Sequence, residues 1–309
     1  MREIMRAGLG RYRDKLGEAV GQLAPASTWP ATGPRLVYRG ARETLLHPSA
    51  PPQLQACLEA AVERGMLVRS PSVRGRLAVE LASAAVSRQI AAYVRQRRKA
   101  DDVHAEPRDL LDAVVRACPA QVSDDTVAQL YRLMFGSVVA NVGYTVAWAL
   151  LLACTYSQGS PWPWTTDSLA REAARHRPLV WMVGRPVPHA GTFGGVALSA
   201  GTVLSVSPYL LHHDPACWSQ PDVFRPERWA EPEACGPYLP FSAGPFTCAG
   251  AAVAHTMVTD TVGALTAGTR LQASHGDTRP LVTNASIPRG FTLHHVRSPH
   301  HKTRQAERR

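Results

Sequence analysis

Apolar residues recur at helical spacing along most of the chain, and this pattern predicts a mainly α-helical protein. The first 23 residues are predicted to form a basic helix, with Ile4, Leu9 and Leu16 among its apolar positions. Proline and glycine interrupt the pattern in residues 24–34, which are therefore predicted to form a loop. Further helices are predicted over residues 51–66, 72–98 and 106–118.

The longest predicted helix is also the most apolar part of the chain, running from Asp124 to Cys154. Because apolar residues cover most of its sides, this helix is expected to cross the middle of the domain. A shorter helix is predicted from Asp167 to the residues before Pro178, which cannot continue it.

Short apolar segments that alternate with turn residues follow this helix, between Pro178 and Val206, and another strand is predicted over residues 288–295. The predicted fold class is therefore mainly α with small β-sheets. We expect a single domain over residues 1–298, with its core motifs in residues 124–298. The polar, basic tail of residues 299–309 is expected to be disordered.

Composition and charge limit the function classes. The chain of 309 residues is 45% hydrophobic and carries a formal charge of +10, as a soluble protein can. The basic residues are spread out without interleaved aromatics, so we expect no nucleic-acid partner, whereas a basic face for an acidic electron-transfer protein fits. No apolar run reaches the roughly 18 residues of a membrane span, and the beginning lacks a signal-peptide pattern. A cytoplasmic protein without membrane contact is expected.

One small-residue loop can present a metal-binding sulfur. It reads Phe241-Ser-Ala-Gly-Pro-Phe-Thr-Cys-Ala-Gly250 and precedes an apolar helix. Its glycines allow close approach of the backbone to a large flat group, and the helix N-terminus favours a thiolate at Cys248. The six cysteines form no Cys-x-x-Cys pair, which argues against a zinc site or a disulfide framework.

This loop resembles the heme-binding loop of the cytochrome P450 family. Phe241, Gly244, Cys248 and Gly250 match the family pattern, whereas Ser242 and Phe246 depart from it. Two further motifs precede the loop in the family's order: a Glu-x-x-Arg helix with Glu172 and Arg175, and a meander over residues 221–229 with the Pro-Glu-Arg motif. The resemblance covers residues 124–298 well and residues 1–123 only loosely, and it implies a P450-like fold that lacks the N-terminal region.

The resemblance implies a role for several residues. Cys248 is the axial thiolate ligand of the iron in heme b, and Arg185 binds a heme propionate. Phe246 occupies the place of a second propionate partner, so one contact to heme is lost. Phe241, Gly244 and Gly250 shape the loop around the cofactor.

The same resemblance assigns structural roles elsewhere. Glu172, Arg175 and Arg228 are expected to form a buried triad that holds the meander against the core. Phe291 and Thr292 are candidates for the substrate pocket.

The central helix departs from the family at its most informative point. P450s usually carry an acid–alcohol pair there, which helps deliver protons to bound oxygen, and these positions fall at Ala140 and Asn141. Neither side chain relays a proton as a carboxylate and a hydroxyl do.

The region before the central helix lacks the family's front part, and Arg2 is the candidate remnant of a helix that contacts a propionate. Either a truncated reading or a genuinely reduced family member explains this. A metal cluster at His212, His213, Asp214 and Cys217 is disfavoured, because the family has such a His-His-Asp-Pro run at a helix start.

Three functions are compatible with these features. The first is a heme-thiolate monooxygenase that oxidises a small hydrophobic metabolite of terpenoid or polyketide type, using O2 and electrons from ferredoxin and its reductase. The second is an atypical heme-thiolate enzyme for peroxide-driven oxidation, coupling or rearrangement. The third is a non-catalytic P450-like partner protein, which the retained Cys248 makes the weakest of the three.

Overall fold

The computed structural model describes residues 1–65, 73–99, 106–157, 161–231, 233 and 235–297. The α-helices are α1 (Arg2–Ala7), α2 (Leu9–Gly21), α3 (Thr32–Leu45), α4 (Pro52–Glu63), α5 (Val73–Lys99), α6 (Leu110–Ala117), α7 (Asp124–Gly136), α8 (Val142–Tyr156), α9 (Thr166–His176), α10 (Pro208–His212) and α11 (Ala251–Thr266). The strands are β1 (Ala26–Trp29), β2 (Val183–Pro186), β3 (Gly191–Phe193), β4 (Val196–Leu198), β5 (Val203–Val206), β6 (Thr269–Ser274), β7 (Leu281–Val282), β8 (Ser286–Ile287) and β9 (Phe291–Arg297). The predicted class, mainly α with small β-sheets, is confirmed.

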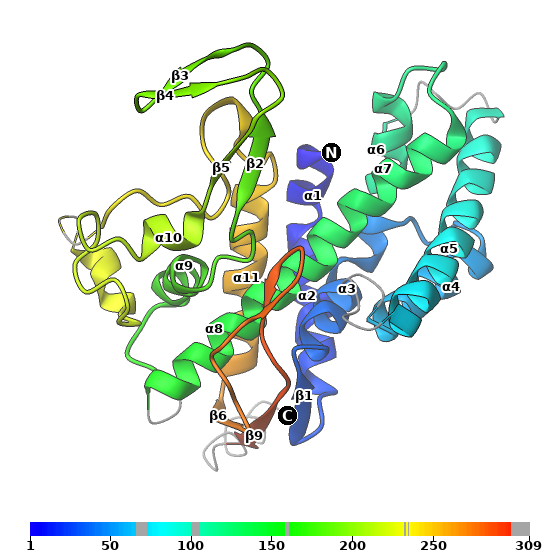
Figure 1. Cartoon of the computed structure of the whole chain (residues 1–309). Coiled ribbons are helices and arrows are strands. Elements are labelled where there is room, and N and C mark those ends of the chain that lie inside the picture. The colour runs from blue at the N-terminus through cyan, green and yellow to red at the C-terminus, as the bar shows by residue number, and fades with distance from the viewer. Residues whose placement is uncertain (66–72, 100–105, 158–160, 232, 234, 298–309) are drawn as a thin grey trace.

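A long helix through the centre organises the molecule, with α7 and α8 running diagonally across it (Figure 1). Ser123 caps the start of α7 by accepting a hydrogen bond from the Thr126 amide. The expectation that no segment is long and apolar enough to span a membrane is wrong for the helix Asp124–Tyr156, but 72% of its most apolar window is buried inside the protein. It is therefore the core helix that the sequence pattern predicted.

A π-helical turn, Ser137–Asn141, separates α7 from α8. Side-chain hydroxyls bond the backbone on both sides of it: Ser137 Oγ donates to the Leu133 carbonyl and Thr145 Oγ1 to the Asn141 carbonyl, each at 2.8 Å. Such bonds from a side chain to the preceding turn compete with the helix ladder. π-Turns of this kind occur often at functional sites.

The predicted loop over residues 24–34 is wrong. Residues Ala26–Trp29 form β1, and α3 begins at Thr32, so Pro34 falls in the first turn of a helix, where its missing amide proton is harmless. Strand β1 pairs with β9, which lies more than 260 residues further along the chain. The local composition of residues 24–34 therefore does not indicate a strand. The sequence pattern also missed the rest of α3.

Helices α3 and α8 touch through two glycines. A Cβ atom added to Gly143 would lie 2.3 Å from the Pro34 backbone nitrogen, and one added to Gly33 would lie 2.2 Å from the Gly143 carbonyl oxygen. Because the obstructing atoms are backbone, side-chain rotation cannot relieve either contact. The two helices approach as closely as they do only because both positions lack a side chain.

We expect Gly143→Ala to lower the free energy of unfolding by about 2 kcal/mol or more, because the helices must separate. Gly136→Ala, in the same long helix, is the matched control: its added Cβ meets nothing within 4 Å, and alanine favours helix by up to about 1 kcal/mol. Urea unfolding of both variants measures the difference. If the two variants are equally stable, the contact between α3 and α8 tolerates an added methyl group and the prediction is wrong.

Strands β1, β9 and β6 form an antiparallel sheet with β9 in the middle. Phe291 lies opposite Trp29, their rings stack with centroids 6.1 Å apart, and both side chains are buried. The expectation that Phe291 lines a substrate pocket is therefore wrong, because its ring is buried against Trp29 on this sheet. Thr292 is half-buried and opposite Thr28, and its role stays a prediction.

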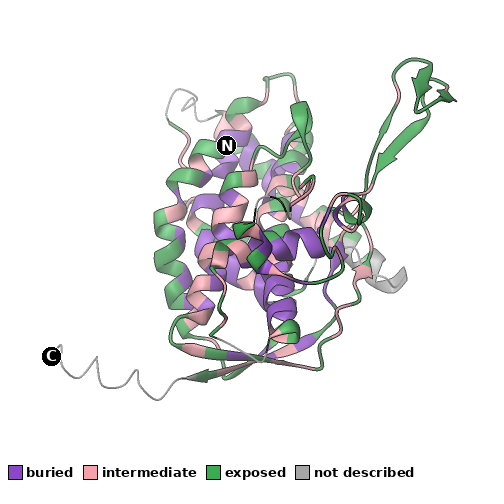
Figure 2. Cartoon of the chain, turned by 90° about the vertical axis from the view of Figure 1, so that its left-hand side faces the viewer, coloured by how far each residue is buried: buried purple, intermediate pink, exposed green. Residues whose placement is uncertain are grey.

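A second antiparallel pair, β2 and β5, continues into the β3–β4 hairpin and projects from the helical body (Figure 2). All four residues of each of β2 and β5 are exposed. Arg185 lies on this ribbon, opposite Leu204.

Candidate functional site

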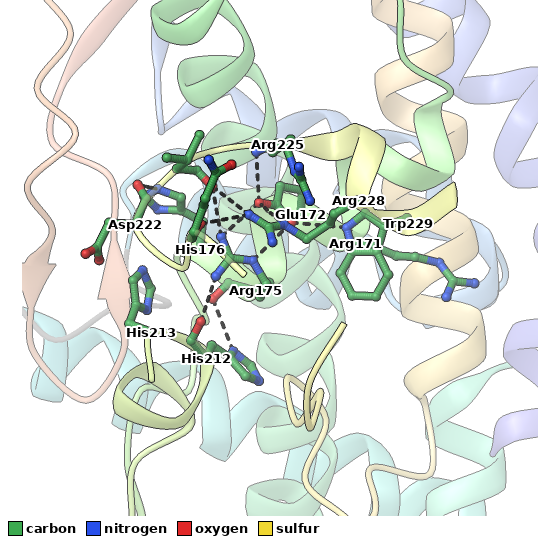
Figure 3. A network of polar contacts seen from close by, with 12 residues as sticks. Arg171, Glu172, Arg175, His176, His212, His213, Asp222, Arg225, Arg228 and Trp229 are labelled. Atoms are coloured by element: carbon green, nitrogen blue, oxygen red, sulfur yellow. Dashed lines mark hydrogen bonds and ion pairs between the residues drawn. The ribbon is translucent and has the colours of Figure 1, made fainter. Parts of the chain in front are cut away.

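A buried ionic network connects α9 to the meander that precedes the cysteine loop (Figure 3). Glu172 accepts two hydrogen bonds from Arg175, at 3.0 and 2.8 Å, and one from Arg228 Nε at 3.1 Å. All three side chains are 0% exposed. The structure thus brings together the three residues of the predicted triad. Thr165 is the N-cap of α9, which carries Glu172 and Arg175, and Arg228 lies in the 3-10 turn Pro226–Ala230.

Every side-chain nitrogen of Arg175 and Arg228 has a hydrogen-bond acceptor. Arg228 donates to the carbonyls of Ser219, Gln220 and Val223, at 2.6, 3.0 and 3.0 Å. Glu172 additionally accepts hydrogen bonds from the Arg225 amide and the Trp229 indole nitrogen. Burial lowers the pKa of Arg228, and the Glu172 carboxylate opposes that effect. Because these carbonyls lie in the meander or directly before it, the Glu172–Arg228 ion pair holds this segment against α9.

His212 extends this network to the cysteine loop. Its Nδ1 lies 3.1 Å from the Arg175 carbonyl and its Nε2 accepts the Leu239 amide at 2.8 Å, so the ring is neutral and protonated on Nδ1. Burial lowers the pKa of His212 to about 4, which keeps it neutral at pH 7. The Leu239 carbonyl in turn accepts the Ser242 amide inside the loop. Both ring nitrogens are thereby used within the protein.

Sequence reasoning missed this role of His212. The sequence placed the His-His-Asp run at a helix start, which is wrong, because His212 is the last residue of α10. Nothing in the run predicts a partner at residue 239. The neighbouring His213 also has a backbone partner, the Tyr209 carbonyl at 2.8 Å from its Nδ1.

The cysteine loop folds around two left-handed residues, Ser242 at φ 62° and Gly244 at φ 61°. The Cys248 amide donates to the Phe241 carbonyl at 2.8 Å, which closes the loop, and α11 begins at Ala251. The Cys248 side chain is exposed. A Cβ added to Gly244 would meet nothing within 4 Å, so the positive φ rather than space explains glycine there.

Arg185 reaches this loop from β2. Its guanidinium carbon lies 3.7 Å from the centroid of the Phe246 ring, two residues before Cys248. The loop and the β2–β5 ribbon therefore meet, although about 60 residues separate them in the sequence.

Apolar side chains lie exposed on these same elements. They include Val183, Leu204, Val206 and Phe246, together with Met182 directly before β2, and these five are 38–58% exposed. A large flat apolar group with carboxylates fits these residues, because it would cover such side chains, bind its metal at the exposed Cys248 sulfur and pair its acid groups with Arg185. Heme is such a group.

The acid–alcohol positions lie on the π-turn. Ala140 is 4% exposed and packs with Tyr144, Leu179 and Ile287, whereas Asn141 is exposed. The sequence departure at these positions thus coincides with a backbone irregularity. Arg2 is exposed in the first turn of α1, which packs against α11.

Comparison with known proteins agrees with this geometry. The sequence model of the family described as Cytochrome P450 matches residues 165–295. Cyclooctatin synthase from Streptomyces melanosporofaciens is 33% identical over 115 residues, 36% of this chain and 25% of that relative. Steroid 17-alpha-hydroxylase/17,20 lyase from Ovis aries is 36% identical over 94 residues, 27% of this chain and 18% of that relative. The matched region thus spans a quarter or less of these curated relatives.

Solved structures extend the likeness to nearly the whole chain. The ligand-free structure of cytochrome P450 TbtJ1 has a TM-score of 0.75 and 16% identity, covering 96% of this chain and 78% of that one. A zebra fish cytochrome P450 with progesterone has a TM-score of 0.72 and 20% identity, covering 96% of this chain and 81% of that one.

The fold and the cysteine loop define a heme-thiolate protein. Residues 165–295 match the cytochrome P450 family, and the fold of the chain is that of solved cytochrome P450 structures. Family and fold imply a heme whose iron is ligated by a thiolate.

Proposed function

We propose that this chain is a heme-thiolate monooxygenase, with Cys248 as the iron ligand. A thiolate-ligated heme, when bound, supplies the oxidising chemistry for inserting one oxygen atom of O2 into a C–H bond. The second oxygen atom leaves as water, which requires two electrons and two protons. The observation that carries the proposal is the exposed Cys248 in a loop tied through His212 to the buried Glu172 network and touched by Arg185.

Each of these residues has a distinct part. Arg185 binds a heme carboxylate, and Phe241, Gly244 and Gly250 give the loop its path past the cofactor. Glu172, Arg175 and Arg228 hold the meander, and thus the loop, in one place. We further propose that residues 1–298 act as one domain.

The substrate is proposed to be a small hydrophobic metabolite of terpenoid, polyketide or steroid type. One relative is named as a steroid hydroxylase, and one structural neighbour is described with progesterone. Electrons are proposed to come from a ferredoxin and its reductase in the cytoplasm, since a formal charge of +10 favours an acidic partner.

The proposal is tested by titrating the purified chain with heme, reducing it and adding carbon monoxide. We expect one heme per chain and the Soret band diagnostic of thiolate ligation. Turnover is then compared with a ferredoxin system and with peroxide, using terpenoid and steroid substrates and detecting products that gain one oxygen atom. A chain that stays heme-free after supplementation would refute the proposal, and product formed with peroxide alone would refute the ferredoxin-driven reaction.

A further inference from the structure

Phe246 stands where the family resemblance leads one to expect a basic residue that binds heme. An aromatic ring cannot form an ion pair with a carboxylate, so the sequence alone indicates that one contact to heme is lost at this position. The structure shows instead that this ring is in contact with the guanidinium of Arg185, at 3.7 Å from its carbon to the ring centroid.

The surroundings make this contact specific. Phe246 is 58% exposed and ends the short 3-10 turn Gly244–Phe246, so its position is set by the cysteine loop. Among the residues that the structure describes, Arg185 has no carboxylate and no side-chain hydrogen-bond partner, and the ring is its contact. Arg185 itself is carried by β2, opposite Leu204.

A guanidinium in contact with an aromatic ring through its face keeps its N–H groups in the plane of the group, pointing away from the ring. These donors form the fork that matches a carboxylate. Holding a long arginine side chain in one orientation also reduces the side-chain entropy lost when a ligand binds.

We propose that Phe246 is a positioning residue for cofactor binding: it holds the Arg185 guanidinium in the orientation that pairs with a heme carboxylate. The inference rests on the proposed function. Phe246 thus makes no ionic contact to heme itself. It favours heme binding by holding the Arg185 guanidinium in place before heme binds.

The test measures heme affinity of the apoprotein by tryptophan quenching, for Phe246→Leu, Arg185→Gln and the double variant. We expect Phe246→Leu to weaken binding about two- to fivefold, as for a cation–π contact at an exposed site, and Arg185→Gln to weaken it about tenfold or more. In the Arg185→Gln background, Phe246→Leu should have no further effect. Phe193→Leu on β3 and Arg39→Gln on α3 change exposed residues of the same types and serve as controls.

Heme dimethyl ester gives a second readout, because its esterified acid groups carry no charge. With this ester the difference between the unchanged chain and Phe246→Leu should disappear. Additive effects of the two substitutions, or an undiminished Phe246→Leu effect with the ester, would overturn the inference while leaving the proposed function intact. If the unchanged chain binds neither heme nor its ester, both proposals fail.

Discussion

Glu172→Ala is expected to lower the free energy of unfolding by about 4 kcal/mol or more, and to yield mostly insoluble protein. The substitution removes the carboxylate between Arg175 and Arg228, both 0% exposed. Removing one partner of a buried ion pair typically costs about 3–5 kcal/mol, because the remaining charge is left uncompensated. Here two guanidinium groups lose the same partner, and the Trp229 indole loses its acceptor.

Glu172→Gln separates charge from volume. The amide has nearly the same size, but its NH2 group would face a guanidinium donor. We therefore expect Glu172→Gln to lower the free energy of unfolding nearly as much as Glu172→Ala does. Glu18→Ala is the control, because Glu18 forms an exposed pair with Lys15 and its side chain is 62% exposed. Such a pair contributes less than about 1 kcal/mol.

Soluble yield and urea unfolding measure these changes. An unfolding midpoint for Glu172→Ala equal to that of Glu18→Ala would show that the buried network contributes nothing to stability.

Cys248→Ala is expected to abolish the thiolate-type spectrum of the reduced, CO-bound protein and to weaken heme binding more than about 100-fold. Substituting a residue that hydrogen-bonds to a metal ligand already lowers metal affinity about 10- to 100-fold. Cys248→Ala removes the ligand itself. The fold should be unaffected, because the side chain is exposed and the loop is closed by backbone hydrogen bonds.

The same thermal or urea midpoint for Cys248→Ala and the unchanged chain would confirm that the loss is local. Cys57→Ala, on α4, controls for the removal of a thiol elsewhere and should keep the thiolate spectrum. The assignment of Cys248 would be wrong if its alanine variant kept the thiolate band, or if Cys57→Ala lost it.

Much of the helical framework can be predicted from the sequence alone. The helix over residues 124–154 is apolar on most of its sides, and its second half, α8, is buried from Val142 to Ala153 except at Thr145. The spacing of Glu172 and Arg175 places both on one helical face, and a cap precedes them. Such features depend on neighbours within one or two turns, and sequence patterns report them well.

Other features depend on partners far away in the chain. β1 is a strand only because β9 hydrogen-bonds to it, and α3 can approach α8 only because Gly33 meets Gly143. Phe291 is read from its position as a pocket residue, yet stacking on Trp29 places it in a core. Each outcome is set by a contact between segments that no local pattern connects.

The amino-acid sequence by itself determined the helical class, the central helix, the cysteine loop and the resemblance to the cytochrome P450 family, because these are recorded in local spacing and short motifs. Only the tertiary structure decided that His212 joins the Glu172 network to the loop, and that the ring of Phe246 contacts Arg185. The physical reason is that hydrogen bonds and ring contacts require atoms within a few ångströms of each other, and chain folding alone brings residues 185 and 246 that close.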